Sequence, residues 1–191
     1  MALTLFRRPA PDEPPTLEDE LWPETGETWT PEGLTVVERY YNLANAVVIL
    51  YTADHKEIGT YYAVACLGCH YLVTRDKHRT YSTRLTLEAA AKAANGHAST
   101  CRALARSLPA RPDDDTARRL LRTWVLNMRR RDQDYYLHLR HFDSRRLELQ
   151  RTDEWMHTEL EAFAADRGDV LSATPSKYGA GIEYELLREP S

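Results

Sequence analysis

Four side chains able to ligate a metal ion stand in two close pairs that are far apart in this 191-residue chain. Cys66 and Cys69 form a C-x2-C pair, and after 27 intervening residues His97 and Cys101 form an H-x3-C pair. Four cysteine and histidine ligands in a tetrahedron are the usual shell of structural zinc. The spacing therefore predicts that these residues bind one structural Zn²⁺ ion and that the fold brings the two pairs together.

The first pair follows a sequence typical of a β-hairpin. Residues 45–52 and 60–74 are rich in β-branched and aromatic residues, and a polar turn sequence separates them. The second strand would end at the cysteines, where Gly68 permits the tight backbone that aims both sulfurs at one point. The stretch just upstream, residues 34–43, fits either a further strand or a short helix.

The second pair lies in a sequence that favours a helix. Thr86 is a good N-cap, and the alanine-rich residues after it predict a helix to about Arg106. His97 and Cys101 are four residues apart, so they would share one face of that helix.

This arrangement over residues 45–106 resembles the C2HC variant of the ββα zinc finger, with two ligands on a hairpin and two on a helix. It is also similar to knuckle-plus-helix modules in small, poorly characterised proteins of GC-rich bacterial mobile elements. The long spacer departs from the finger, in which about twelve residues separate the pairs. The helix offers Leu87 and alanines where a DNA-reading helix carries Arg, Asn or Gln, so we expect a packing helix.

Other interpretations of the cysteines remain. The sequence from Cys66 to His70 also matches the CxxCH pattern of c-type haem attachment, and a CxxC alone is found in thioredoxin-like proteins. The three cysteines could also be buried side chains beside a surface histidine. An odd number of cysteines argues against a disulfide framework.

The remainder of the chain completes an α+β prediction. Residues 1–33 form an acidic, proline-rich tail, residues 34–108 the zinc-binding hairpin and helix module, and residues 109–191 a mainly helical region packed on it. Helices are expected after the aspartates at 113–115 and after Thr152. A rough helical period continues from the first of them to Phe142, either unbroken or with a break near Asp132. The last segment, from residue 181, alternates like an edge strand. Trp22 and Trp29 in the tail would pack back onto the domain or bind a partner.

Charge is strongly segregated along the chain, although the net charge is only −4. Residues 102–151 hold thirteen arginines and seven acidic residues, whereas both ends of the chain are acidic. Such a segment could contact nucleic acid or an acidic protein, or the acidic ends could neutralise it within the fold. The arginines that we select as candidate nucleic-acid ligands are Arg118, Arg119, Arg122, Arg129, Arg130, Arg131 and Arg140.

No nucleophile and base stand at a spacing that indicates catalysis, and no apolar run approaches the ~20 residues of a membrane helix. With no secretory leader evident, the sequence favours a cytoplasmic protein. The leading hypothesis is a zinc-stabilised binding protein, regulatory or accessory, that contacts nucleic acid. The alternatives are a protein–protein adaptor, or a hydrolase or nuclease using residues after 130, such as His138 with His141 or Asp153 and Glu154 with His157.

Overall fold

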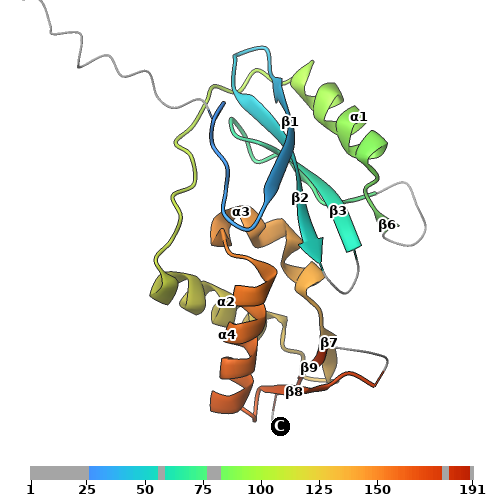
Figure 1. Ribbon diagram of the computed structural model, residues 1–191, viewed down its shortest axis with the longest axis vertical. Helices are drawn as coiled ribbons and strands as arrows, with labels where there is room; N and C mark the ends of the chain where they lie inside the picture. The colour runs from blue at the N-terminus through green and yellow to red at the C-terminus, as the bar shows by residue number, and fades with distance from the viewer. Residues whose placement is uncertain (1–25, 56–58, 77–82, 178–180, 190–191) are drawn as a thin grey trace, which may run out of the picture.

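The computed structural model describes residues 26–55, 59–76, 83–177 and 181–189, and it has the α+β fold that the sequence predicts. Figure 1 shows a sheet and one helix in the upper half of the molecule, with a group of helices and a smaller sheet below them. Most of the expected acidic tail, including Trp22, lies outside the described residues. Trp29 packs against the core of the upper half, which was one of its two expected roles.

The first sheet contains the predicted hairpin and one strand on each side of it. Its strands are β1 (Thr35–Tyr41), β2 (Val47–His55), β3 (Gly59–Cys66) and β4 (Leu72–Val73), all antiparallel and in the order β1-β2-β3-β4. The upstream stretch that the sequence left open is therefore a strand. The pairing of Val48 with Cys66 fixes the register, so the C-x2-C pair begins where the hairpin ends.

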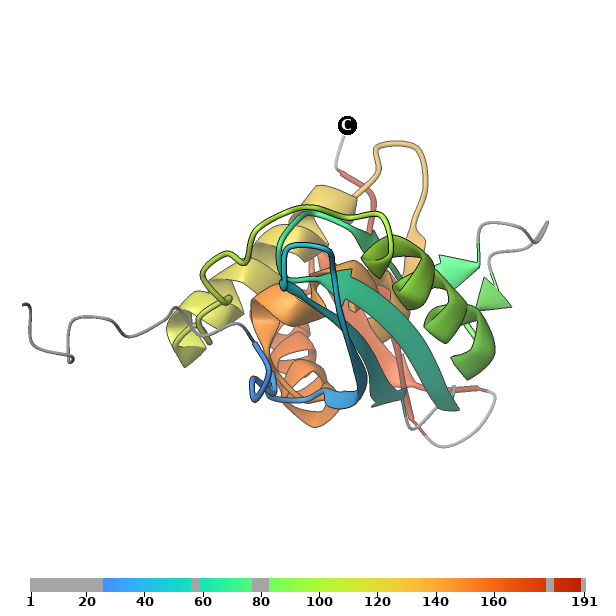
Figure 2. The same ribbon diagram turned by 90° about the horizontal axis from the view of Figure 1, so that it is seen from above.

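Helix α1 (Leu87–Ala98) covers one face of this sheet (Figure 2). Thr86 caps it as predicted, accepting a hydrogen bond from the backbone N–H of Ala89. Only alanine side chains of α1 are buried, at positions 90, 94 and 98. The expected end near Arg106 is wrong, because the hydroxyls of Ser99 and Thr100 bond to the carbonyl of Gly96 and the helix stops at Ala98.

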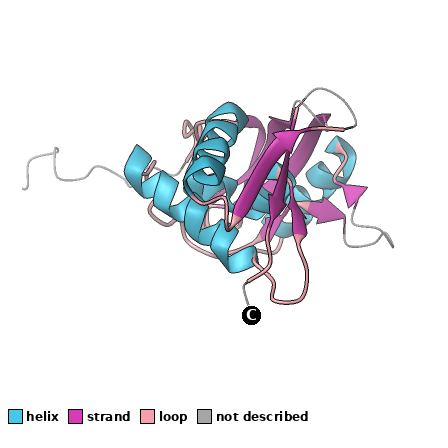
Figure 3. Cartoon of the chain, turned by 90° about the horizontal axis from the view of Figure 1, so that it is seen from below, coloured by secondary structure: helices cyan, strands magenta, loops and turns pink. Residues whose placement is uncertain are grey.

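The opposite face of the sheet packs on the C-terminal half. Ile49, Tyr51 and Tyr61 on that face are buried together with Leu108 and Leu147, which come from segments beyond α1. Figure 3 shows the strands lying between helices on either side. A separate two-stranded ribbon, β5 (Arg75–Asp76) with β6 (Thr83–Arg84), precedes α1.

The C-terminal half combines helices with a second sheet. Its elements are α2 (Asp114–Met128), β7 (Tyr135–Leu137), the 3-10 helix η2 (Leu139–Arg145), α3 (Arg146–Leu149), α4 (Asp153–Asp166), β8 (Leu171–Pro175) and β9 (Ile182–Leu186). The sheet order is β7-β9-β8. The helix starts at Asp113 and Thr152 are confirmed, with both side chains as N-caps. Of the two alternatives for the following segment, the structure has the break: α2 ends at Met128, and Tyr136 pairs with Glu185 in the second sheet instead of continuing a helix.

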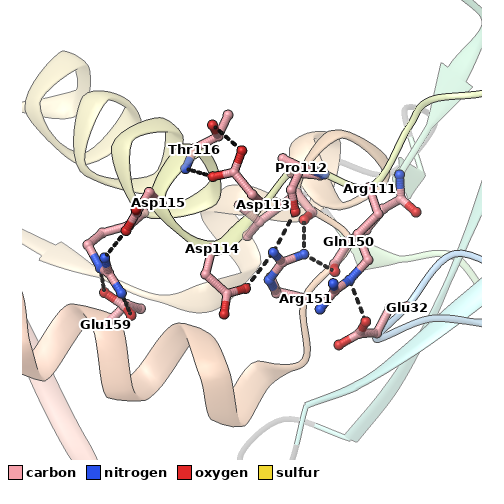
Figure 4. Close-up of polar contacts among 12 residues, drawn as sticks. Glu32, Arg111, Pro112, Asp113, Asp114, Asp115, Thr116, Gln150, Arg151 and Glu159 are labelled. Atoms are coloured by element: carbon pink, nitrogen blue, oxygen red, sulfur yellow. Dashed lines mark hydrogen bonds and ion pairs between the residues drawn. The ribbon is translucent and has the colours of Figure 1, made fainter.

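Two buried arginines hold the C-terminal helices to the chain that enters them. Arg151 donates to the carbonyl of Pro112 at 2.6 Å and to the carboxylate of Asp114 at 2.7 Å (Figure 4). Arg146 pairs with Asp153, and its side chain is fully buried. Gly33 has φ 75° and lies against the backbone of Arg151, so the segment before β1 is pressed onto the same place.

Candidate metal centre

The four predicted ligands meet in space, although they come from distant parts of the chain. The sulfurs of Cys66, Cys69 and Cys101 and a ring nitrogen of His97 all lie within 4.8 Å of one another. Cys69 Sγ is 3.4 Å from His97 Nε2. Tetrahedral Zn²⁺ with Zn–S about 2.3 Å and Zn–N about 2.0–2.1 Å separates sulfur from nitrogen by about 3.5 Å and two sulfurs by about 3.8 Å. The Cys69–His97 separation matches this geometry, and the four atoms are close enough together to hold one metal ion.

The turn that carries the first pair is closed by backbone bonds. Cys66 N–H donates to the carbonyl of Tyr71 at 3.0 Å. Gly68 is required by space, because a Cβ there would lie 2.8 Å from the Cβ of Ala46 and 2.9 Å from the carbonyl oxygen of Leu104. A side chain at this position would push the segment after Cys101 away from the turn, and the two ligand pairs would separate.

The second pair sits at the end of a helix and just beyond it. His97 is in the last turn of α1, and the N–H of Cys101 bonds to the His97 carbonyl at 2.9 Å. The β1–β2 turn holds the following residues, since the Asn42 side chain donates to the Ala103 carbonyl at 2.8 Å and to Cys101 Sγ at 3.3 Å. Leu43 N–H donates to the Cys101 carbonyl at 3.0 Å. The pair is thus fixed by a loop as much as by a helix face.

Each cysteine sulfur accepts a hydrogen bond from the backbone two residues further on. Gly68 N–H donates to Cys66 and Tyr71 N–H donates to Cys69, each at 3.4 Å, and the backbone of Ala103 bonds to Cys101. Donors aimed at sulfur favour the thiolate, which is the form that binds metal. The bond from Ala103, with a smaller contribution from Asn42, lowers the pKa of Cys101.

Burial acts in the opposite direction at the deepest ligand. It raises the pKa of the Cys66 thiol to about 11, so this sulfur holds its proton at neutral pH unless a cation replaces it. Burial also lowers the pKa of His97, which keeps the imidazole neutral and its lone pair available. Metal binding at this site should therefore release protons.

An aromatic side chain orients the histidine. The ring of Tyr71 stacks on that of His97 with centroids 3.8 Å apart and planes 11° apart, and its hydroxyl donates to the carbonyl of Ala93. Sequence reasoning missed both Tyr71 and Asn42. The first looks like any aromatic residue in a strand-forming run, and no spacing rule connects the second to residues 59 positions away.

His70, the histidine of the CxxCH pattern, is not part of the cluster. It is exposed and lies 3.2 Å from Arg106 Nη1, and the other guanidinium nitrogen of Arg106 donates to the carbonyl of Cys69 at 3.0 Å. Arg106 therefore contacts the backbone of one predicted ligand and the side chain of the residue after it. This arrangement fits a metal bound by cysteine and histidine better than an attached haem.

The seven candidate nucleic-acid arginines are spread over α2 and the segment after it, and several have partners. Arg118 pairs with Glu159 and Asp115, and these two acidic side chains are labelled in Figure 4. The remaining contacts are Arg119 to Thr116, Arg122 to Asp166, Arg129 to the carbonyls of Leu187, Asp169 and Arg188, Arg131 to Glu189, and Arg130 over the ring of Tyr135. Acidic residues near the C-terminus therefore neutralise part of the basic segment. Arg140 is exposed.

His141, His157 and Asp153, which were considered for catalysis, are engaged with other side chains. His141 Nε2 lies 2.9 Å from the Tyr135 hydroxyl, and His157 Nδ1 lies 2.9 Å from that of Tyr184. Asp153 pairs with Arg146. Among the residues that the structure describes, Cys66, Cys69, His97 and Cys101 form the one group of three or more His, Cys, Asp or Glu side chains close enough to hold a metal.

Comparison with protein-family models, with curated proteins and with solved structures gave no significant match. The fold and the site define an α+β protein with a Cys3His cluster of a size that holds one metal ion. Across the described part of the chain, no helix combines the length and apolar character needed to cross a membrane.

Proposed function

We propose that the chain is a zinc-stabilised binding protein with a regulatory or accessory role, and that its partner is a nucleic acid. The observation that supports zinc binding is that three thiols and one imidazole lie within 4.8 Å of one another. Sulfur-rich tetrahedral sites select zinc over magnesium, calcium or manganese, which take oxygen ligands. All four positions are filled by protein ligands, so the ion is structural and no position is open for catalysis.

The ion would join three segments in addition to the hydrogen bonds that already connect them. These are the turn after β3, the end of α1 and the loop that begins at Cys101. Since α1 buries only alanines, its own side chains contribute little apolar area to its contact with the sheet. Metal–ligand bonds at the end of this helix would replace the contacts that larger side chains make elsewhere.

Elemental analysis of the purified protein tests the zinc directly, with one zinc per chain expected. Cys101→Ser should lower the zinc content well below one, because it removes a ligand while keeping the side chain's size. His70→Ala is the matched control, since this exposed histidine is adjacent to Cys69 but outside the cluster, and its zinc content should be unchanged. If the Cys101→Ser variant still bound one zinc per chain, the proposal that all four residues bind the ion would be wrong.

The nucleic-acid part of the proposal rests on charge. Arginine suits phosphate because its planar fork donates two parallel bonds, and the exposed arginines of residues 102–151 have this option. Fluorescence anisotropy of the zinc-loaded protein with DNA and RNA oligonucleotides, at several salt concentrations, is the test. Binding should weaken steeply with salt, because each neutralised phosphate releases counterions. No binding at low salt would exclude the nucleic-acid partner and leave the zinc centre intact.

A further inference from the structure

We infer that single-stranded nucleic acid binds on a surface where the two halves of the chain meet, an inference that rests on the proposed nucleic-acid contact. We call this the junction surface. Its residues are Arg75, Arg84, Arg130, Tyr136, His138 and Arg140. They come from the β5–β6 ribbon, the segment after α2, strand β7 and the start of η2.

Three of the arginines converge from different parts of the chain. Arg75 Nη2 lies 3.5 Å from the carbonyl oxygen of Arg140, and Arg75 is the direct partner of Arg84 in the β5–β6 ribbon. All three are exposed. Within the described residues none of them forms an ion pair with a carboxylate, unlike Arg118 and Arg122 on α2. Their guanidinium groups are therefore available to phosphate oxygens.

Aromatic rings lie in the chain between Arg130 and Arg140. Tyr136 and His138 are two residues apart in extended chain, so they project from the same face of it at a spacing of about 6.6–6.8 Å. Tyr136 is 55% exposed although it is a large aromatic residue. His138 contacts the ring of His141, with centroids 5.5 Å apart. Exposed flat rings next to a positive groove or track are the usual features of single-strand binding.

His138, His141 and Tyr135 are connected to the charges by a continuous set of contacts, whereas Tyr136 projects from the other face of β7 than Tyr135. The hydroxyl of Tyr135 lies 2.9 Å from His141 Nε2, and the guanidinium of Arg130 lies over the Tyr135 ring at 4.9 Å. On the other side, Arg140 precedes His141 and touches Arg75. The order along the surface is therefore Arg84, Arg75, Arg140, the two histidines, Tyr135 and Arg130, with positive charge at both ends.

The lowered pKa of His141 agrees with positive charge at the junction surface. Burial, followed by the charges of His138, Arg140 and Arg75, lowers its pKa to about 4, whereas Asp143 acts in the opposite direction. Asp143 is itself buried. Glu185, the cross-strand partner of Tyr136, is a carboxylate on the Tyr136 face, so the positive charge of the surface is concentrated at Arg75, Arg84 and Arg140.

A single strand fits this surface better than a duplex. Stacking on Tyr136 and His138 requires bases that are not paired, whereas the bases of a duplex are enclosed by its own stacking. The described helices also lack a groove-reading face, because α1 presents alanines and the α2 arginines nearest α4 are paired with Glu159 and Asp166.

Anisotropy titrations of the zinc-loaded full chain test the inference, using fluorescent 12-nucleotide dT and U strands and a duplex of the same length. Both single strands should bind, and the duplex should bind more weakly. Tyr136→Ala should weaken single-strand binding by roughly tenfold or more, as loss of one stacked base does. Arg75→Ala combined with Arg84→Ala should weaken it and reduce the salt slope by about 1.4, for two lost phosphate contacts.

The control is Arg118→Ala combined with Arg122→Ala, which removes the same charge from α2 and should leave the affinity unchanged. Zinc content and circular dichroism of each variant verify folding. Loss of binding in this control but not in the junction variants would overturn the inference while the nucleic-acid function stands. Preference for the duplex would overturn it as well. If the unmodified protein bound none of the strands, both this inference and the proposed nucleic-acid function would be wrong.

Discussion

The two halves of the molecule bury their helices in different ways. Helix α1 in the N-terminal half presents Ala90, Ala94 and Ala98 to its sheet, whereas α4 in the C-terminal half presents Met156, Leu160 and Phe163 to its core. Each buried methylene contributes about 0.8 kcal/mol, so the first helix gains far less from apolar contact. The metal ligands His97 and Cys101 stand at the end of that weaker helix. The candidate metal centre therefore lies at the end of the helix that buries only small side chains.

The largest test of this difference is removal of the metal. A structural zinc site contributes on the order of 10–16 kcal/mol in isolated peptides, which is as large as the whole free energy of unfolding of a typical domain. A strong chelator, or Cys101→Ser, should remove hydrogen-exchange protection from the amides of β3 and α1. Amides of α2 and α4 should keep theirs, because their core does not include the ligands. Equal loss of hydrogen-exchange protection in both halves, or no loss after verified metal removal, would show that the two halves do not differ in their dependence on the metal.

The same division explains what the sequence could predict. The helix starts at Thr86, Asp113 and Thr152 follow from local spacing, and the structure confirms them. The two metal-ligand pairs also stand out by their spacing, and the structure brings them within metal-binding distance. These features depend on residues only a few positions apart. Short-range rules of capping and periodicity are sufficient for them.

The features that were missed depend on contacts between distant residues. Strand β7 exists because Tyr136 pairs with Glu185, and no helical or strand period near 136 indicates that partner. Asn42 reaches Cys101 across the sheet for the same reason. The early end of α1 is a local error, in which two hydroxyl side chains compete for helix carbonyls and outweigh helix propensity.

The next largest effect is expected where the halves are joined. The side chain of Arg146 is fully buried and pairs with Asp153, and its charge acts on Tyr51 in the first sheet. Arg146→Ala should reduce the free energy of unfolding by about 3–5 kcal/mol, because it leaves a carboxylate without its buried partner. Arg131→Ala, which breaks the exposed pair with Glu189, should change it by no more than about 1 kcal/mol.

Urea unfolding followed by tryptophan fluorescence measures both variants. If Arg146 couples the two halves, the unmodified protein should unfold in one transition and the Arg146→Ala variant should unfold in two. Equal effects of the buried and exposed substitutions would mean that the junction does not depend on this ion pair.

A smaller effect is expected from pH. The pKa of His141 is lowered from 6.5 to about 4 by burial and neighbouring charge, so between these values the unfolded chain binds more protons than the folded one. Stability should be complete above pH 6.5 and fall as the pH decreases towards 4. His141 is only half-buried, so after solvent screening we expect about 1–2 kcal/mol.

His141→Gln should flatten this part of the stability curve, measured by thermal unfolding between pH 4 and 7. The zinc ligands also take up protons in this range, so the comparison is made between the two proteins at matched zinc content. An unchanged slope would show that the acid sensitivity arises elsewhere.

The smallest expected effect comes from replacing the N-cap residue of one helix in each half. Thr86 caps α1 and Thr152 caps α4, each accepting a backbone N–H bond of 3.2 Å from the residue three positions on. In the zinc-loaded protein, Thr86→Ala and Thr152→Ala should each reduce stability by about 1 kcal/mol. After metal removal the two should differ, because a cap contributes nothing to a helix that is no longer folded. Thr152→Ala should keep its effect and Thr86→Ala should lose it. If Thr86→Ala still destabilises the metal-free protein by the same amount, α1 folds without the ion, and alanine packing on the sheet is sufficient after all.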